Sequence, residues 1–189
     1  KIRDLIKKAD ICINLIGILY QKGKINTFEN IHEKFPEFLS VLCSEYGVQK
    51  FIHLSALGID EAKDSQYAQS KLAGENKIKN NFKLATILRP SVIYAVDDNF
   101  TTNLMTLLNR LPIFPLYYNG STIFAPIHIS DLVKIIYQVI IKNINSTIIE
   151  CVGPEEISFK DILLRLLGLI EKKRLLIPMP LFVSKLSAS

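Results

Sequence analysis

Cysteine is scarce in this chain of 189 residues, and what there is does not form a pattern. The three cysteines, Cys12, Cys43 and Cys151, are far apart and lie within short apolar stretches. An odd number at such distances predicts buried thiols in a reducing compartment and argues against a disulfide framework. The cysteines and the histidines His32 and His128 form no recognisable metal-ligand pattern, so we predict that the chain binds no metal.

Long apolar runs are also missing. No uninterrupted stretch reaches the ~18 apolar residues that a membrane-spanning helix needs, and no secretory signal peptide is recognisable. The chain begins at Lys1 rather than at an initiator methionine and enters a helical pattern at once. We therefore expect a segment of a longer protein, with no transmembrane segment in it.

The charge is only mildly basic, with 23 Lys and Arg against 18 Asp and Glu and a formal net charge of +5. These lysines are scattered, and no stripe of arginine and aromatic residues accompanies them, so we predict no nucleic-acid binding. A weak attraction to an anionic lipid surface or to an acidic partner fits the same charges. The composition, 49% hydrophobic and 22% charged, is that of a globular protein.

Short apolar runs alternate with helical periods along the whole chain. The apolar runs predict strands over 10–17, 48–54, 84–88, 122–124 and 148–152, and 21–30 is predicted to be a loop. The helical periods cover 2–9, 35–46, 67–80, 101–111, 130–142 and 158–170. Strands that alternate with helices of this length predict an α/β fold with a parallel sheet covered on both faces.

The stretch Tyr67-Ala-Gln-Ser-Lys71 carries the clearest chemical signal. A Tyr and a Lys four residues apart lie on one face of a helix, so the ammonium can sit beside the phenol. A cation near the phenol can lower its pKa from ~10 towards neutral pH. The pair could then transfer a proton to or from a substrate carbonyl, and the Lys could also bind a cofactor ribose. Alone, the spacing is a weak signal, because it occurs by chance in lysine-rich helices.

The surrounding motifs resemble the extended or atypical short-chain dehydrogenase/reductase superfamily, which includes NAD-dependent epimerases and dehydratases. The motifs are Asn14-Leu-Ile-Gly17, Gly47-Val-Gln-Lys-Phe-Ile-His-Leu-Ser-Ala56, Tyr67-x-x-x-Lys71-x-x-Gly74-Glu75, Leu88-Arg-Pro-Ser91 and Ile127-His-Ile-Ser-Asp131. Within the superfamily, the narrower resemblance is to the Rossmann-type accessory subunit of respiratory NADH:ubiquinone oxidoreductase (complex I) and its bacterial relatives. The closing segments Val152-Gly-Pro154 and Leu176-Ile-Pro-Met-Pro-Leu-Phe182 share this narrower resemblance.

The resemblance implies a Rossmann-like doubly wound parallel sheet whose N-terminal strands lie outside this segment, followed by a small C-terminal α/β lobe. Residues up to about 100 would supply the later strands and helices, and residues from about 101 to 189 the interleaved lobe. The glycine loop that binds the pyrophosphate, and the residue that separates NAD from NADP, would precede Lys1. The expected cofactor is therefore NADP or NAD, with the choice left open.

The resemblance also implies residue roles. Cofactor-binding positions would be Asn14, Leu15, Gly17, Tyr67, Lys71, Pro90, Ser91 and Val92, with Tyr67, Lys71 and Ser55 as the catalytic candidates. Active relatives carry a second hydroxyl residue after the strand, and here that position is Ala56, which cannot donate a hydrogen bond. Either Ser55 takes the place of this donor after a small register shift, or a substrate carbonyl has no side-chain donor, and losing such a donor can cost a factor of ~10²–10³ in rate. His53 sits inside a predicted strand, where packing in the sheet is the expected role.

Two hypotheses follow from different classes. In the first, the chain is an NAD(P)-binding accessory or assembly subunit of complex I in which the cofactor is structural. It would sit peripherally on the cytoplasmic side of a bacterial inner membrane, or in the mitochondrial matrix if eukaryotic. In the second, it is an active NAD(P)-dependent reductase, epimerase or dehydratase acting on a small carbonyl or sugar-nucleotide substrate. The apolar tail 163–183 fits either packing of the C-terminal lobe or docking on a partner subunit or membrane face.

Overall fold

A computed structural model describes residues 1–179, which form two compact units. The first unit consists of residues 1–90 and 130–151, and the second of residues 91–129 together with those from 152 onward. Each unit has its own hydrophobic core. The last part of the closing motif and of the tail, from Pro180, lies outside the described residues.

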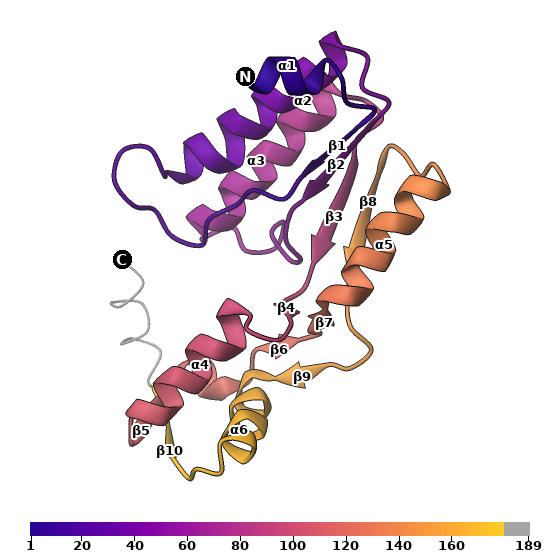
Figure 1. The fold of residues 1–189 in the computed structure, drawn as a ribbon. Coiled ribbons are helices and arrows are strands. Elements are labelled where there is room, and N and C mark those ends of the chain that lie inside the picture. The colour runs from indigo at the N-terminus through magenta and orange to yellow at the C-terminus, as the bar shows by residue number, and fades with distance from the viewer. Residues whose placement is uncertain (180–189) are drawn as a thin grey trace. The chain divides into compact units, whose positions relative to one another are not determined.

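The first unit is built on a parallel sheet (Figure 1). Its strands are β1 (Ile11–Asn14), β2 (Lys50–Leu54), β3 (Thr86–Pro90) and β8 (Thr147–Cys151), in the order β1-β2-β3-β8. The register places Asn14 opposite His53 and His53 opposite Ile87, so the carboxyl ends of these strands are aligned. The parallel α/β sheet predicted from the alternating pattern is confirmed.

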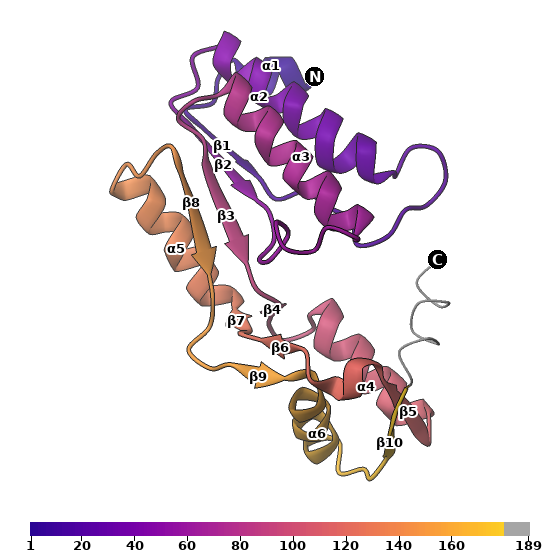
Figure 2. The ribbon, with the colours of Figure 1, turned by 180° about the vertical axis from the view of Figure 1, so that it is seen from behind.

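Helices cover this sheet on both faces, as Figures 1 and 2 show. One face carries α1 (Ile2–Ile6), the π-helix η1 (Glu29–Lys34), α2 (Phe35–Glu45) and α3 (Gln66–Asn81), and the other carries α5 (Ile129–Ile141). We predicted a loop over 21–30 and a helix from residue 35. The structure has in addition the helix η1, which begins within the predicted loop and runs directly into α2. Parallel strands need such crossover helices, because the chain must return to the same end of the sheet before each new strand.

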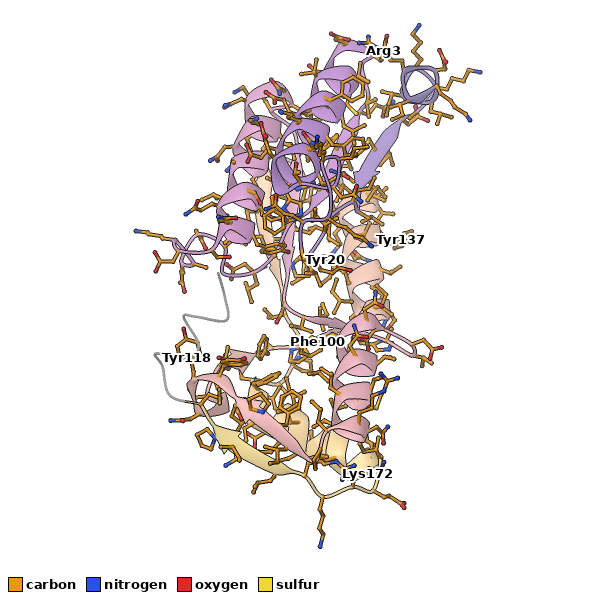
Figure 3. The ribbon with its side chains drawn as sticks, turned by 90° about the vertical axis from the view of Figure 1, so that its left-hand side faces the viewer. Arg3, Tyr20, Phe100, Tyr118, Tyr137 and Lys172 are labelled. Atoms are coloured by element: carbon orange, nitrogen blue, oxygen red, sulfur yellow. The ribbon has the colours of Figure 1, made fainter. Side chains whose placement is uncertain are left out.

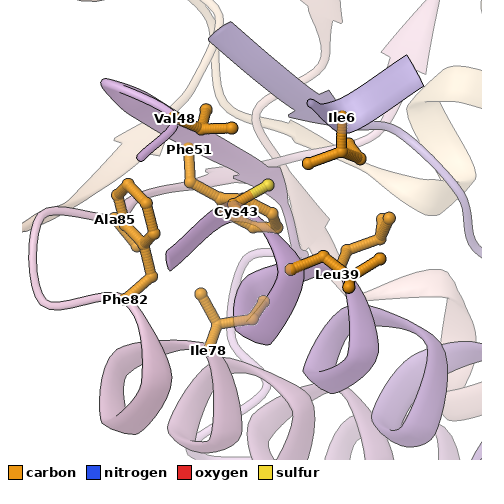
Figure 4. Close-up of a cluster of buried hydrophobic side chains, with 9 residues drawn as sticks. Ile6, Leu39, Cys43, Val48, Phe51, Ile78, Phe82 and Ala85 are labelled. Atoms are coloured by element: carbon orange, nitrogen blue, oxygen red, sulfur yellow. The ribbon is translucent and has the colours of Figure 1, made fainter. Parts of the chain in front are cut away.

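The core of the first unit lies between β2 and the helices α2 and α3 (Figure 4). Phe51 of β2 is fully buried there against Phe82, with ring centroids 5.8 Å apart. The helical period of 35–46 places its apolar residues on this side, which is why α2 forms at all. The thiol of Cys43 is buried in the same cluster, and all three cysteines are free.

As far as Met179, the second unit contains three two-stranded sheets and two long helices. Its elements are β4 (Ile93–Tyr94), α4 (Asn99–Arg110), β5 (Ile113–Leu116), the 3₁₀ helix η2 (Tyr117–Gly120), β6 (Ile123–Phe124), β7 (Ile127–His128), β9 (Ile157–Ser158), α6 (Phe159–Leu169) and β10 (Leu175–Pro178). β4 pairs with β7 and β5 with β10 in parallel, and β6 pairs with β9 antiparallel. The predicted N-terminus of the last helix is confirmed, because Ser158 caps α6 by accepting the amide hydrogen of Asp161.

The sequence pattern did not indicate two strands of the second unit, β5 and β10, each of which contains a proline. β5 includes Pro115, and its partner β10 lies in the apolar tail 163–183, for which no strand was predicted. Both strands belong to a two-stranded sheet, so each has a free edge where proline costs no ladder hydrogen bond. Among the residues that the structure describes, no helix is long and apolar enough to cross a bilayer.

Candidate functional site

Tyr67 and Lys71 lie one turn apart on α3, close to the carboxyl ends of the strands. Ser65 caps this helix, its hydroxyl accepting the amide hydrogen of Ala68 at 3.3 Å. Lys71 is only 4% exposed and donates a hydrogen bond from Nζ to the carbonyl oxygen of Leu54, at the end of β2, at 2.8 Å. The ammonium is therefore fixed against the strand end rather than free to move.

Burial shifts the pKa of both side chains. Burial lowers the pKa of Lys71 to about 8, and the carboxylate of Glu75 offsets part of that effect. Burial raises the pKa of the Tyr67 phenol. The expectation that Lys71 lowers the phenol's pKa is wrong for this arrangement. In this structure burial disfavours the phenolate, and the tethered ammonium does not compensate.

His32 is a site residue that the sequence interpretation missed. It comes from η1 and is 2% exposed. Its Nε2 accepts the amide hydrogen of Ile18 at 3.1 Å, so the neutral ring carries its proton on Nδ1, 2.9 Å from Ser70 Oγ. Ser70 in turn donates to the carbonyl oxygen of Tyr67 at 2.8 Å. These bonds connect η1, the loop after β1 and α3 into one network.

Aromatic contacts complete the surroundings of His32. Its ring stacks on that of Phe28, with the ring centroids 5.2 Å apart. It also makes a T-shaped contact with the ring of Tyr67, with the centroids 5.3 Å apart. Burial and the nearby charge of Lys71 lower the pKa of His32 to about 4. The imidazole is therefore neutral at pH 7, and it can position Tyr67 but supplies no cation to it.

One glycine allows this network to close, and a second lies beside it. A Cβ on Gly74 would lie 1.9 Å from the carbonyl oxygen of His32, so only glycine lets α3 approach η1 so closely. A Cβ on Gly17 would lie 3.7 Å from His32 Nε2 and 3.8 Å from Lys71 Nζ. Gly17 is thus next to Lys71, which brings a predicted cofactor-binding residue to the Tyr67–Lys71 pair.

Asn14 and His53 form a second buried pair, between β1 and β2. Asn14 Nδ2 lies 3.0 Å from His53 Nδ1, and Asn14 Oδ1 accepts the amide hydrogen of Ile16 at 3.1 Å. Burial, with the charges of Lys71 and His32 adding to it, lowers the pKa of His53 to about 3. His53 is buried in the sheet as predicted, and its pairing with Asn14 shapes the loop at Leu15, whose side chain is exposed.

The buried polar atoms without a partner gather near the same strand end. Within residues 1–179 these are His53 Nε2 and Ser55 Oγ. Ser55 follows Leu54, the residue that holds Lys71, and its amide donates to the carbonyl of Leu88 at 2.7 Å. Buried polar groups are seldom left unpaired, so these atoms suit a site that takes a polar ligand or water. No cluster of three or more potential metal ligands occurs in the described part of the chain.

The remaining predicted positions are the last residue of β3, Pro90, and the two residues after it. The carbonyl of Pro90, in the first unit, accepts the amide hydrogen of Leu57 at 3.0 Å. Ser91 and Val92 belong to the second unit, where Ser91 Oγ accepts the amide hydrogen of Ala125 at 3.3 Å. The roles of these three residues at a nicotinamide stay predictions.

A buried ion pair next to Pro90 was also not predicted from the sequence. Arg89 donates through Nε and Nη2 to the two carboxylate oxygens of Glu75 at 3.0 and 2.9 Å, and through Nη1 to Asp60 at 2.8 Å. Glu75 is fully buried, and these bonds raise the pKa of Arg89. The bidentate pair fixes α3, and with it Tyr67 and Lys71, to the end of β3.

Comparison with known proteins gives relatives that agree with the sequence resemblance. No protein-family model matches the chain. It is 28% identical over 132 residues to the Arabidopsis thaliana "NADH dehydrogenase [ubiquinone] 1 alpha subcomplex subunit 9, mitochondrial", covering 69% of this chain and 33% of the relative. The Mus musculus protein of the same name is 25% identical over 183 residues, covering 96% and 48%. The Caulobacter vibrioides "Ceramide reductase" is 30% identical over 127 residues, covering 67% and 39%.

The fold has close counterparts among solved structures. A dTDP-4-dehydrorhamnose reductase from Clostridium acetobutylicum matches with a TM-score of 0.78 at 19% identity, covering 94% of this chain and 69% of that one. UDP-glucuronic acid 4-epimerase from Bacillus cereus, solved with UDP-glucuronic acid and NAD, matches with a TM-score of 0.76 at 22% identity, covering 95% and 65%. The predicted Rossmann-like fold and the predicted resemblance to complex I subunits are both confirmed, and the chain spans between a third and a half of these subunits.

Proposed function

We propose that the chain is part of an NAD(P)-binding accessory or assembly subunit of respiratory complex I, in which the dinucleotide has a structural role. The observation that carries the proposal is its similarity to complex I subunits from a plant, a mammal and a fungus. A cofactor that binds only the folded state stabilises it by mass action and needs no turnover to do so. The protein would then lie peripherally at the membrane that holds the complex.

The site fits a bound dinucleotide better than it fits proton transfer. Gly17 leaves the backbone after β1 open beside Lys71, and Lys71 can donate to ribose hydroxyls while it stays bound to Leu54. A nicotinamide cofactor would supply hydride chemistry, and burial raises the pKa of the Tyr67 phenol, which disfavours the phenolate that would accept a proton from an alcohol substrate. Ala56 offers no side-chain donor for a substrate carbonyl. The balance of these features favours cofactor retention over catalysis.

An active NAD(P)-dependent reductase is the second candidate. Two observations favour it: the Tyr67–Lys71 spacing on α3, and the similarity to a protein named ceramide reductase. In this reading, the protonated Tyr67 is the proton donor to a substrate carbonyl during reduction, and Lys71 binds the cofactor. A raised phenol pKa is compatible with donation of a proton, though it makes the reverse reaction slower.

The test uses the complete natural protein at its native expression level. Membrane NADH dehydrogenase is isolated, and its content of this protein is measured by native electrophoresis and quantitative mass spectrometry. Tyr67→Phe is compared with Tyr20→Phe, a control at a side chain that is 72% exposed (Figure 3). We expect stoichiometric co-migration, and near-normal assembly and NADH oxidation in both variants.

Two results would reverse the conclusion. If the protein occurs only outside the complex, the subunit proposal fails. If purified protein reduces a carbonyl substrate with NAD(P)H and Tyr67→Phe alone lowers kcat by orders of magnitude, the reductase is correct. Dinucleotide binding is measured separately by calorimetry, so that loss of the cofactor is not confused with loss of assembly.

A further inference from the structure

The second unit contains a cavity of about 260 Å³ whose wall includes neither Tyr67 nor Lys71 and shares only Val92 with the predicted cofactor positions. It lies among β4, the N-terminal turn of α4, the segment before β9, and α6. Its walls are mainly apolar and include Val92, Tyr94, Phe100, Ile157, Ile162 and Leu166. Figure 3 labels Phe100, which also packs against the core of this unit. The cavity is therefore continuous with a well-packed hydrophobic core.

The charged side chains of the wall and its threonine hydroxyl are already paired. The hydroxyl of Thr101 donates to Asp98, the residue that caps α4. Arg165, the wall's one cation among the described residues, donates through both terminal nitrogens to the carboxylate of Glu155, with Nη1 to Oε2 at 2.8 Å. Both side chains of this ion pair are more than half exposed, so it lies where the cavity meets solvent.

The apolar wall and its paired polar groups indicate which class of ligand the cavity can bind. A nucleotide diphosphate needs unpaired cationic or amide donors, and here its phosphates would have to displace Glu155 from Arg165. An apolar chain needs no hydrogen-bond donor. Each methylene that it buries raises the affinity about fourfold. A volume near the lower end of the ~300–1,000 Å³ range of ligand pockets suits a chain or a small ring rather than a whole sugar nucleotide.

We propose that this cavity binds the acyl chain of a lipid, with the polar end of the molecule at the Arg165–Glu155 pair. The inference is independent of the function proposed above, because a subunit could retain such a lipid and a reductase could use it as a substrate. It assigns the chain-binding role to α6 and the N-terminal turn of α4.

The first experiment measures the affinity for fatty alcohols of increasing length, whose uncharged heads do not compete with Glu155 for Arg165, by displacement of a fluorescent fatty alcohol from the full-length protein. We expect affinity to rise severalfold per methylene and then to level off when the cavity is full. Ile162→Trp fills the cavity and should lower affinity at least tenfold. Leu164→Trp is the matched control, because Leu164 lies on the same helix and is 48% exposed. Circular dichroism and thermal melting verify that both variants fold.

A second pair of measurements keeps the proposal falsifiable if Ile162→Trp does not fold. Phe100→Ala enlarges the cavity and should move the plateau to longer chains. Glu155→Gln releases Arg165 and should tighten binding of a fatty acid severalfold while leaving the matching fatty alcohol unchanged. The proposal is overturned if affinity does not depend on chain length, if Ile162→Trp and Leu164→Trp act alike, or if a nucleoside diphosphate competes with the probe.

Discussion

A neutral imidazole buried in the folded state makes stability depend on pH, and the first unit contains two of them. The pKa of His32 is lowered from 6.5 to about 4, and that of His53 from 6.5 to about 3. Below pH 6.5 the unfolded chain takes up protons at these rings while the folded chain does not. Stability therefore falls as the pH drops through 6.5, and it continues to fall until the folded rings titrate.

We expect the free energy of unfolding to decrease between pH 7 and pH 5 by about 2 kcal/mol for each ring. The measurement is urea unfolding at both pH values, followed by the circular dichroism of the helices. His32→Gln removes one titrating group, so it should reduce this pH-dependent loss by about half while lowering stability at pH 7. An unchanged difference between the two pH values in His32→Gln would show that the ring is not buried and neutral.

At the scale of elements, the approach of η1 to α3 depends on one glycine. A Cβ at position 74 would lie 1.9 Å from a backbone oxygen of η1, so the two elements must separate if it is added. Gly74→Ala should cost several kcal/mol, in the range of severe core changes (about 3 kcal/mol or more), and should release His32 from Ser70. Protection of the η1 amides against hydrogen exchange, together with thermal melting, would report both effects.

Gly168 provides the matched control on another helix. It lies near the end of α6, and a Cβ there would meet nothing within 4 Å. Gly168→Ala should therefore stabilise the protein slightly, by up to about 1 kcal/mol, because alanine loses less backbone entropy. If Gly74→Ala stabilises the protein as Gly168→Ala does, helix propensity, rather than the contact with η1, governs position 74.

The order of the strands in the first unit and the main site helix were predictable from the sequence because both depend on local patterns. Alternating apolar runs fix the strands, and the spacing of Tyr67 and Lys71 places both on one helix face. The contacts of His32 were not predictable, because Ser70 is 38 residues away and η1 lies in a polar segment. The ion pair of Arg89 with Glu75 likewise joins a strand end to a helix. Such pairs are set by the packing of elements and not by spacing.

At the scale of the whole chain, charge and exposed apolar surface act against each other. A net charge of +5 favours solubility, yet β1 is an edge strand that pairs only with β2 among residues 1–179. Ile11 and Ile13 on this strand are 37% and 39% exposed, and the outward face of α5 exposes Val133 and Tyr137. An unpaired strand edge with apolar side chains is a site where another chain can add.

We therefore expect residues 1–189, when produced as an isolated segment, to self-associate through β1 as their concentration rises. Ile13→Lys places a charge on the edge strand and should shift sedimentation velocity profiles towards the monomer. Leu169→Lys adds the same charge at a side chain of the second unit that is 76% exposed, and it should have much less effect. If both lysines suppress association equally, net charge is the cause, and the edge of β1 is not the contact.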